Sequence, residues 1–162
     1  MDDFIRTKQL VDRVIAKLGL SPEKAKVADG SDQVSWTVLR GSAHVLVTVA
    51  HRPEQKGTFF RVAAPVMLVA SDRPREPLYR RLLELNAGGL VNAAFGLIGD
   101  KVVAVSERPV ASLDENEVEQ IVRQTSAVAD TYDDRLVAEF GGVRASDVKR
   151  TETVDPGMGV GG

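Results

Sequence analysis

Two histidines, His44 and His51, carry the only imidazole groups in the sequence. Successive side chains of a β-strand point to opposite faces, so their odd spacing along one strand places the two rings on opposite sides. They cannot jointly bind a metal ion, and neither has an obvious partner for a serine triad. We interpret both as ordinary surface histidines, and we predict no metal site and no catalytic residue.

A dense group of carboxylates occurs at Asp114, Glu115, Glu117 and Glu119. Such a group suits general acid–base catalysis or a divalent cation. The first turn of a helix is a simpler explanation, because the helix dipole favours negative charge there. SLDE at 112–115 also has the spacing of a capping box, in which Ser112 and Glu115 satisfy each other's backbone donors. We therefore predict a helix N-terminus at this position and no enzymatic activity.

Two other motifs resemble binding sites for phosphate groups. GMGVGG at 157–162 has no predicted strand before it and no predicted helix after it, so the arrangement that lets such a loop bind a dinucleotide is missing. Four arginines are interleaved with glutamates, as is usual for a solvated helix face: Arg73, Arg75, Arg80 and Arg81. Neither motif predicts a cofactor or a nucleic-acid partner.

The composition bounds the class of protein. With 162 residues, of which 43% are hydrophobic and 27% charged, the chain fits one ordinary globular domain. It contains no cysteine, which excludes disulfides, thiol nucleophiles and thiolate-bound metals. The net charge of −2 provides no general attraction to nucleic acid or anionic lipid.

The sequence also gives an expectation for the compartment. MDDFIRTKQL at the start lacks the basic and apolar regions of a signal peptide. The longest apolar run, VAAPVMLVA at 62–70, is far shorter than the about 20 residues that a membrane-spanning helix needs. We expect a cytoplasmic protein without a membrane partner.

The apolar residues of the N-terminal half change from a helical period to a strand period. Residues 2–18 carry one apolar face of a helix, and Gly19 follows as a C-terminal cap. From 34 to 66 the period is two, interrupted by RGSA at 40–43 and RPEQKG at 52–57. We predict three antiparallel strands in a meander.

The C-terminal half is predicted as helix, hairpin and helix. Leucines recur at helical spacing over 77–87, and AGG at 87–89 ends this helix because glycine readily takes the positive φ of a cap. Alternating apolar residues over 91–105 surround IGDK at 98–101, a tight-turn signal. The last helix follows the capping box and ends near Phe140.

These elements predict an α+β domain with an antiparallel sheet and the order α-β-β-β-α-β-β-α. We assign residues 1–140 to this single domain. Residues 141–162 contain six glycines and almost no apolar periodicity, and we predict a flexible glycine-rich tail.

The second face of the predicted sheet carries apolar side chains of its own. If Val45 and Phe60 point towards the helices, the alternation sends a second set to the opposite face. This set consists of Leu39, Leu46, Phe59 and Met67. Such a patch often marks an interface, which a second copy of the chain or an extended peptide could cover. The first helix or the tail could equally cover it from within the chain.

The element order and two stretches of sequence resemble the YbjN-like family and the related class I type III secretion chaperones. The first stretch is LYRRLLELNAGGLVNAAFGLIGDKVVAVSERPV at 78–110, in which a Leu-Leu-x-Leu-Asn helix end leads to a hairpin with Phe95 in its first strand. The second is SLDENEVEQIVRQTSAVADTYDDRL at 112–136, a capped final helix with Tyr132 near its end. The resemblance covers roughly residues 3–140 and implies the same small α+β fold.

The resemblance implies a homodimer that binds an extended or unfolded protein segment without chemistry, as a chaperone or a regulatory adaptor. The set on the second sheet face would then be the peptide-binding surface. Three residues would lie near the dimer seam: Leu82, Leu83 and Phe95. A net charge of −2 is mild for a secretion chaperone, which favours the YbjN-like branch. The alternative is a small-ligand sensor with a pocket between helix and sheet.

Overall fold

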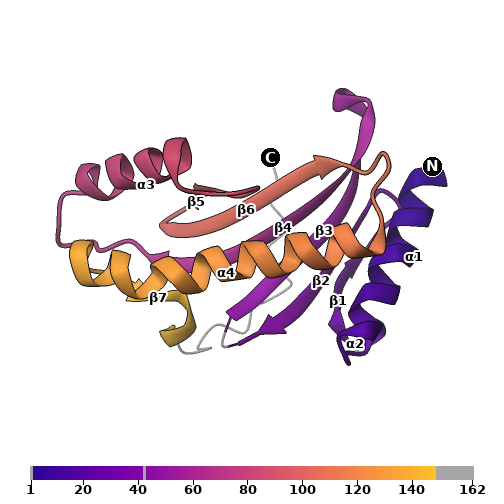
Figure 1. Cartoon of the computed structure of the whole chain (residues 1–162), viewed down its shortest axis with the longest axis horizontal. Helices are drawn as coiled ribbons and strands as arrows, with labels where there is room; N and C mark the ends of the chain where they lie inside the picture. Colours follow the sequence, from indigo (N-terminus) through magenta and orange to yellow (C-terminus); the bar gives the residue numbers. More distant parts are fainter. Residues whose placement is uncertain (1, 42, 149–162) are drawn as a thin grey trace, which may run out of the picture.

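The structure is a computed structural model that describes residues 2–41 and 43–148 (Figure 1). Its helices are α1 (Asp2–Lys17), α2 (Pro22–Ala25), α3 (Glu76–Gly88) and α4 (Glu115–Phe140), with short 3-10 turns η1 (Pro53–Gln55) and η2 (Ala145–Asp147). Its strands are β1 (Lys26–Asp29), β2 (Gln33–Arg40), β3 (Ala43–Arg52), β4 (Gly57–Leu68), β5 (Ala94–Ile98), β6 (Lys101–Pro109) and β7 (Val143–Arg144). The strands pair antiparallel in the order β1-β2-β3-β4-β6-β5, and β7 pairs with β4.

This arrangement confirms the predicted α+β class and the order of the long elements. The meander β2–β3–β4 and the hairpin β5–β6 join through the β4–β6 pair into one sheet. The sequence does not predict β1 and β7. They have only four and two residues, which is too few for an alternating pattern to be recognised.

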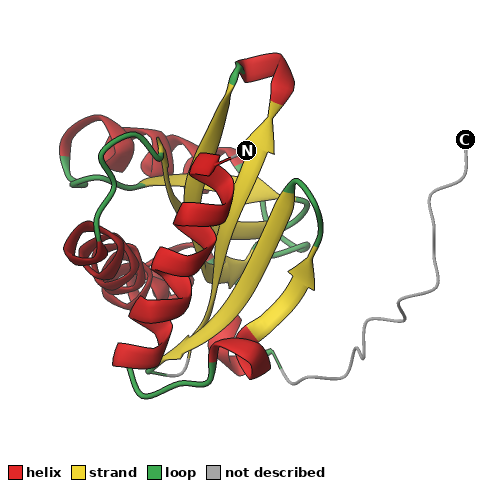
Figure 2. Cartoon of the chain, turned by 90° about the vertical axis from the view of Figure 1, so that its right-hand side faces the viewer, coloured by secondary structure: helices red, strands yellow, loops and turns green. Residues whose placement is uncertain are grey.

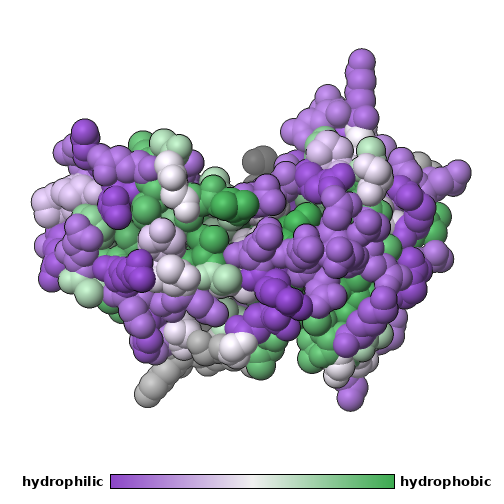
Figure 3. Space-filling model, viewed as in Figure 1, coloured by the Kyte–Doolittle hydropathy of each residue, from purple (hydrophilic) through white to green (hydrophobic). Residues whose placement is uncertain are grey.

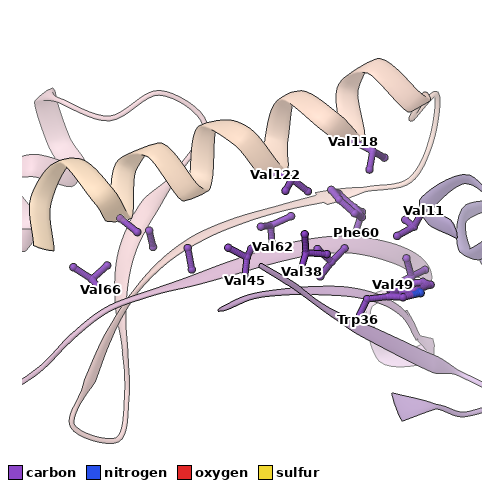
Figure 4. Packing of buried hydrophobic residues seen from close by; sticks show 14 of the residues in the cluster. Val11, Trp36, Val38, Val45, Val49, Phe60, Val62, Val66, Val118 and Val122 are labelled. Carbon is purple, nitrogen blue, oxygen red and sulfur yellow. The ribbon is translucent and has the colours of Figure 1, made fainter. Parts of the chain in front are cut away.

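Inward-facing side chains of the central strands form the core beneath α1 and α4. Trp36, Val47 and Phe60 come from three neighbouring strands, and each is at most 1% exposed. Val11 of α1 and Val118 of α4 point at this layer (Figure 4), and Figure 2 shows both helices on the same side of the sheet. Each fully buried large apolar side chain stabilises the fold by about 1.5–3 kcal/mol.

A directed hydrogen bond complements the apolar face of α1. The buried indole of Trp36 donates its Nε1–H to Asp12 Oδ1 at 3.0 Å. The other oxygen, Asp12 Oδ2, lies 3.7 Å from the Lys26 Nζ of β1. A buried indole N–H requires a partner, so this contact fixes where α1 lies along the sheet.

The N-terminus of α4 lies two residues later than predicted. Asp114 is the N-cap, and it forms a capping box with Glu117 in which both reciprocal hydrogen bonds are present. Ser112 instead has a φ of 58° and donates its hydroxyl to the Ala111 carbonyl. The predicted Ser112–Glu115 box is therefore wrong. Leu113 is buried directly before the cap, and as a hydrophobic staple it delays the first helical residue.

The glycines after α3 do not take the predicted positive φ. Gly88 still belongs to the helix, and Gly89 caps it with a φ of −126°. The positive φ falls on Asn92, at 54°, where the chain turns into β5. At the end of α1 the expectation is met, because Gly19 has a φ of 81°.

The domain continues beyond the predicted boundary at residue 140. β7 pairs with β4 through the contacts Met67–Arg144 and Leu68–Val143, and η2 follows. Gly142 has a φ of 86°, and a Cβ there would collide with the Leu68 carbonyl oxygen. Residues 141–148 are thus part of the fold, which the glycine content concealed. The remainder of the predicted tail, 149–162, lies outside the described residues.

Candidate functional site

The sheet face opposite α1 and α4, which we call the outer face, carries two exposed leucines. Leu46 pairs with Thr37 across β2 and β3, which places Leu39 in the diagonal position about 7–8 Å away. Leu39 is 53% exposed and Leu46 41% exposed. The long helices pack against the other face (Figure 2), so the structure brings two of the predicted peptide-binding residues together in solvent.

Phe59 lies on the same face but apart from the leucines. It pairs with Ala50, which is four residues from Leu46 along β3, or about 13 Å. The Phe59 ring is half-buried and lies beneath the Arg52 guanidinium, with 5.3 Å between Cζ and the ring centroid. The predicted four-residue patch is therefore not contiguous.

An ion-pair network separates Phe59 from the two leucines. Glu107 accepts two hydrogen bonds from Arg52, at 2.8 and 2.9 Å, and one from Arg61 at 3.3 Å. The hydrogen bond from Arg52 holds the pKa of the Glu107 carboxyl below its ordinary value, and Arg61 lowers the pKa further. The outer face is consequently apolar at one end and charged at the other.

The prediction that Met67 lies on the outer face is wrong, because Met67 is fully buried. A bulge in β4 breaks the alternation: the pairing with β6 passes from Pro65–Val103 directly to Met67–Val102. Val102 is itself fully buried, so Met67 joins the inner side of the sheet. Sequence alternation cannot reveal a bulge within an apolar run.

Two of the three residues predicted near a dimer seam are packed inside their own chain. Leu82 is 5% exposed and Phe95 is 7% exposed. The Phe95 ring meets Tyr132 of α4 edge to face, with 5.5 Å between the ring centroids. These two side chains therefore belong to the core. Of the three predicted seam residues, Leu83 is the one exposed to a partner, at 68%.

Asn86, for which the sequence gave no role, joins α3 to β5. Its Nδ2 donates to the Phe95 carbonyl at 3.1 Å, and its Oδ1 accepts from the Phe95 N–H at 2.7 Å. The side chain thus pairs with β5 as a residue of a neighbouring strand would. The only sequence signal for this role is the asparagine at the end of the LLELN motif. An analysis based on the spacing of apolar residues assigns no role to a polar residue at that position.

A second apolar surface lies around α3 and β5. We call it the α3–β5 patch, and its members are between 44% and 70% exposed: Leu83, Val91, Leu97 and Ile98. Figure 3 shows hydrophobic surface between α3 and α4, over β5. β5 is also the last strand of the sheet and contains neither a charged residue nor a proline, the usual protections of an exposed strand edge.

A groove of about 540 Å³ runs between β6 and α4. This β6-edge groove is lined by Asn92 and Ala93 before β5, by Ala94 at its start, by strand residues 105–108 and by one stripe of α4. The α4 stripe consists of Glu117, Gln120, Ile121 and Gln124. The groove exists because β5 begins at Ala94, opposite Val105, whereas β6 continues to Pro109 beside β4 (Figure 1).

A smaller hollow of about 440 Å³ lies beside α1. Phe4, Ile5 and Lys8 form one wall, and Gly30 and Ser31 of the β1–β2 turn form the other. Ile5 is 49% exposed there. No sequence-based prediction placed a site at this position.

The described residues present no arrangement for acid–base or metal chemistry. His51 Nδ1 lies 3.2 Å from the Thr58 hydroxyl, and His44 is exposed on the outer face. Among residues 2–41 and 43–148 no three histidine or carboxylate side chains come close enough to hold a metal ion. None of the described helices is long and apolar enough to cross a membrane.

The sequence matches one protein family over residues 6–148, and the chain belongs to it: TY-Chap1, described as T3SS (YopN, CesT) and YbjN peptide-binding chaperone 1. This assignment confirms the resemblance on which the sequence-based prediction rested. The class of the protein is that of a peptide-binding chaperone, not of an enzyme. No curated protein matches the chain.

Solved structures with the same fold come from chaperone complexes. A chain of the HopA1–SchA chaperone–effector complex has a TM-score of 0.58 at 12% identity, covering 83% of this chain and 98% of that one. A chain of the ExsC–ExsE complex has a TM-score of 0.57 at 17% identity, covering 81% and 93%. A chain of the ExoU–SpcU complex of the Pseudomonas aeruginosa type III secretion system has a TM-score of 0.53 at 14% identity, covering 80% and 97%. These matches establish the fold.

Proposed function

We propose that this protein is a chaperone or regulatory adaptor that binds an extended segment of another protein at the apolar end of its outer face. The observation that carries the proposal is the exposure of Leu39 and Leu46, at 53% and 41%, on neighbouring strands. Exposed apolar side chains side by side on a sheet are what an extended segment would cover. The peptide-binding class of the family supports this assignment.

Phe59 belongs to the proposed surface as its second contact point. An extended segment rises about 3.3 Å per residue, so four residues span the about 13 Å from the leucines to Phe59. The ring is held in place by Arg52, and its half-buried edge is the only aromatic surface offered at that end of the described sheet. The client would cross the Arg52–Glu107–Arg61 network between the two points.

We further propose a homodimer that forms through the α3–β5 patch. Leu83 and Leu97 would lie at its centre, because both are exposed, Leu97 on the last strand of the sheet and Leu83 on α3 beside it. Leu82 and Phe95 would support this seam from inside the chain. A cytoplasmic location completes the proposal and rests on the sequence-based expectation.

The small-ligand alternative receives less support. A sensor needs a pocket that encloses a compact molecule. The β6-edge groove is the larger of the two hollows described above, and it is an open channel along a strand, lined by charged and amide side chains. An open, elongated shape suits a chain better than a compact ligand, and its lining also includes apolar side chains such as Val105 and Ile121.

Peptides selected on the protein from a random library displayed on phage test the proposal. The Leu46→Glu variant should bind the selected peptides at least about tenfold more weakly than the wild type, because burial of a leucine contributes about 1.5–3 kcal/mol. Leu20→Glu is the matched control, since Leu20 is 36% exposed in the α1–α2 link, away from the outer face. Equal affinities of the two variants, both folded by circular dichroism, would contradict the proposed surface.

A further inference from the structure

The β6-edge groove contains an uncompleted strand position. Residues 106–109 of β6 remain paired with β4, through Val62–Ser106, Arg61–Glu107, Phe60–Arg108 and Phe59–Pro109. On the other side the pairing with β5 ends at Val105. Within the described chain, one edge of this rigid strand segment therefore has no strand beside it.

The direction of the backbone groups in this segment follows from one hydrogen bond. Val110 donates its N–H to the Thr58 carbonyl, on the β4 side, at 3.1 Å. Successive residues of a strand direct their backbone groups to alternate edges. Arg108 therefore points its N–H towards β4, whereas Glu107 points both its N–H and its carbonyl into the groove.

The opposite wall of the groove carries side chains that can bind a peptide backbone. Gln120 and Gln124 lie on the same stripe of α4, and Asn92 lies at the end of the groove. Within the described chain none of these three amides makes a side-chain hydrogen bond. An amide side chain both donates and accepts, so it can bind a peptide group whatever the side chain of that residue is.

The charges in the groove are already paired. Arg108 Nη1 donates to Glu117 Oε1 at 2.6 Å, and the Glu107 carboxylate is held by Arg52 and Arg61. Among the described residues that line the groove, every charged side chain is therefore paired, which favours an occupant that is neutral along this stretch. Val105 and Glu107 lie on the outer-face side of β6, so the groove is continuous with the proposed client surface.

We infer that the β6-edge groove takes an uncharged, extended segment of the client, which pairs with β6 at Glu107 as an added strand and is held from α4 by Gln120 and Gln124. This inference rests on the proposed function, because it assumes a client segment and names the strand edge that binds its backbone. The backbone contacts give affinity that tolerates many sequences, and the outer-face leucines select for apolar side chains.

Two substitutions at one position isolate the backbone contact. Glu107→Pro removes the groove-facing N–H, and a strand edge tolerates proline where the N–H is not needed by its neighbour. Glu107→Ala keeps that N–H and loses the same carboxylate. Peptides selected from the random phage library should bind the proline variant roughly tenfold more weakly than the alanine variant, the effect of one lost backbone hydrogen bond.

Amide hydrogen exchange gives a second readout in the wild-type protein. Without peptide the Glu107 N–H should exchange rapidly and the Arg108 N–H slowly; saturating peptide should slow exchange at Glu107 and leave Arg108 unchanged. Protection of Glu107 that grows with protein concentration would assign the edge to a second copy. Protection in dilute protein without peptide would assign it to the chain's own remaining residues. Either result would overturn the inference.

The outcomes separate this inference from the proposed function. If Leu46→Glu weakens binding while the two Glu107 variants bind alike, the groove is not used and only this inference fails. If the two Glu107 variants differ and Leu46→Glu binds normally, the groove is the client site and the outer-face proposal fails. A library that yields no binding peptide overturns both.

Discussion

Glu107 serves two surfaces with different parts of one residue. Its side chain is 27% exposed, and the carboxylate accepts hydrogen bonds from Arg52 and Arg61 on the outer face, while its backbone faces the β6-edge groove. The carboxylate network keeps the middle of the outer face polar, which limits the exposed apolar area between the leucines and Phe59. The proposed client surface therefore consists of separate contact points, the two leucines and Phe59, with charged side chains between them.

The Glu107 network makes a pH-dependent contribution to stability. Because Arg52 and Arg61 lower the pKa of Glu107 in the folded state, this stability is present above the ordinary glutamate pKa of about 4.3 and is lost as the pH falls through the lowered value. We expect Glu107→Gln to lose no more than about 1 kcal/mol of unfolding free energy at pH 7, since the pair is partly exposed. The difference from wild type should shrink below about pH 4. Urea unfolding at several pH values measures it, with the exposed Glu139→Gln as control; a difference that grows on acidification would refute the assignment.

The elements explain why the joint between α3 and the hairpin is so compact. α3 ends against β5, and Asn86 pairs with the backbone of Phe95 while the Phe95 ring packs on Tyr132. A single side chain thus closes part of the outer edge of β5. The LLELN motif is followed by Ala87 and two glycines, and the helix ends at Gly88, two residues after Asn86.

Replacement of Asn86 tests this joint. Asn86→Ala leaves the Phe95 N–H and carbonyl without their partner, and we expect a loss of about 1–3 kcal/mol in unfolding free energy. Asn86→Asp keeps an acceptor for the Phe95 N–H but places a carboxylate oxygen against the Phe95 carbonyl, so it should also lose stability at neutral pH. Thermal or denaturant unfolding gives both values. Equal stability of the alanine variant and the wild type would mean that the paired geometry contributes nothing.

Gly142 tests whether the segment after α4 belongs to the fold. Gly142→Ala combines a φ of 86° with a clash against the Leu68 carbonyl, so β7 should detach from β4 and uncover Met67. We expect a loss of at least about 1 kcal/mol in unfolding free energy. Gly88→Ala is the control, because a Cβ there meets no atom within 4 Å and the residue is helical. Faster proteolysis after residue 140 should accompany the loss, and an unchanged proteolytic pattern would contradict it.

The long elements could be predicted because each shows a sustained apolar period, as in the α4 stripe and the alternation of β2, β3 and β4. The misplaced residues share one cause, which is that tertiary contacts override a local pattern. The bulge after Pro65 turned Met67 inward, the buried Leu113 moved the α4 cap, and Gly142 enabled a strand where glycines suggested a tail. The β6-edge groove could not be predicted, because it depends on the unequal lengths of β5 and β6.

The whole molecule distributes two proposed tasks over different parts of one sheet. The α3–β5 patch lies at the β5 end of the sheet and is assigned to a second copy, whereas Leu39 and Leu46 lie on strands at the other end and are assigned to the client. This separation allows a dimer to form without covering Leu39 and Leu46. Two copies would also present two client surfaces to one extended segment, which would raise the overall affinity.

The dimer is tested by light scattering coupled to size exclusion. A two-fold interface uses the same patch twice, so Leu83→Glu removes two leucine contacts and should weaken self-association at least about a hundredfold. At micromolar concentration we expect a dimer for the wild type and for Leu20→Glu, and a monomer for Leu83→Glu. A monomeric wild type would contradict the proposed homodimer, and a dimeric Leu83→Glu would place the seam elsewhere.

The most direct test of the central claim is to map a phage-selected peptide on the protein by NMR, with leucine, isoleucine and valine methyl groups labelled. The peptide binds the outer face if the methyl groups of Leu39, Leu46 and Val105 shift on titration, while Ile5 beside α1 stays unchanged. Shifts confined to Ile5 would place the client at the α1 hollow. Shifts confined to Leu83 and Leu97 would place it on the α3–β5 patch, and either result would contradict the account.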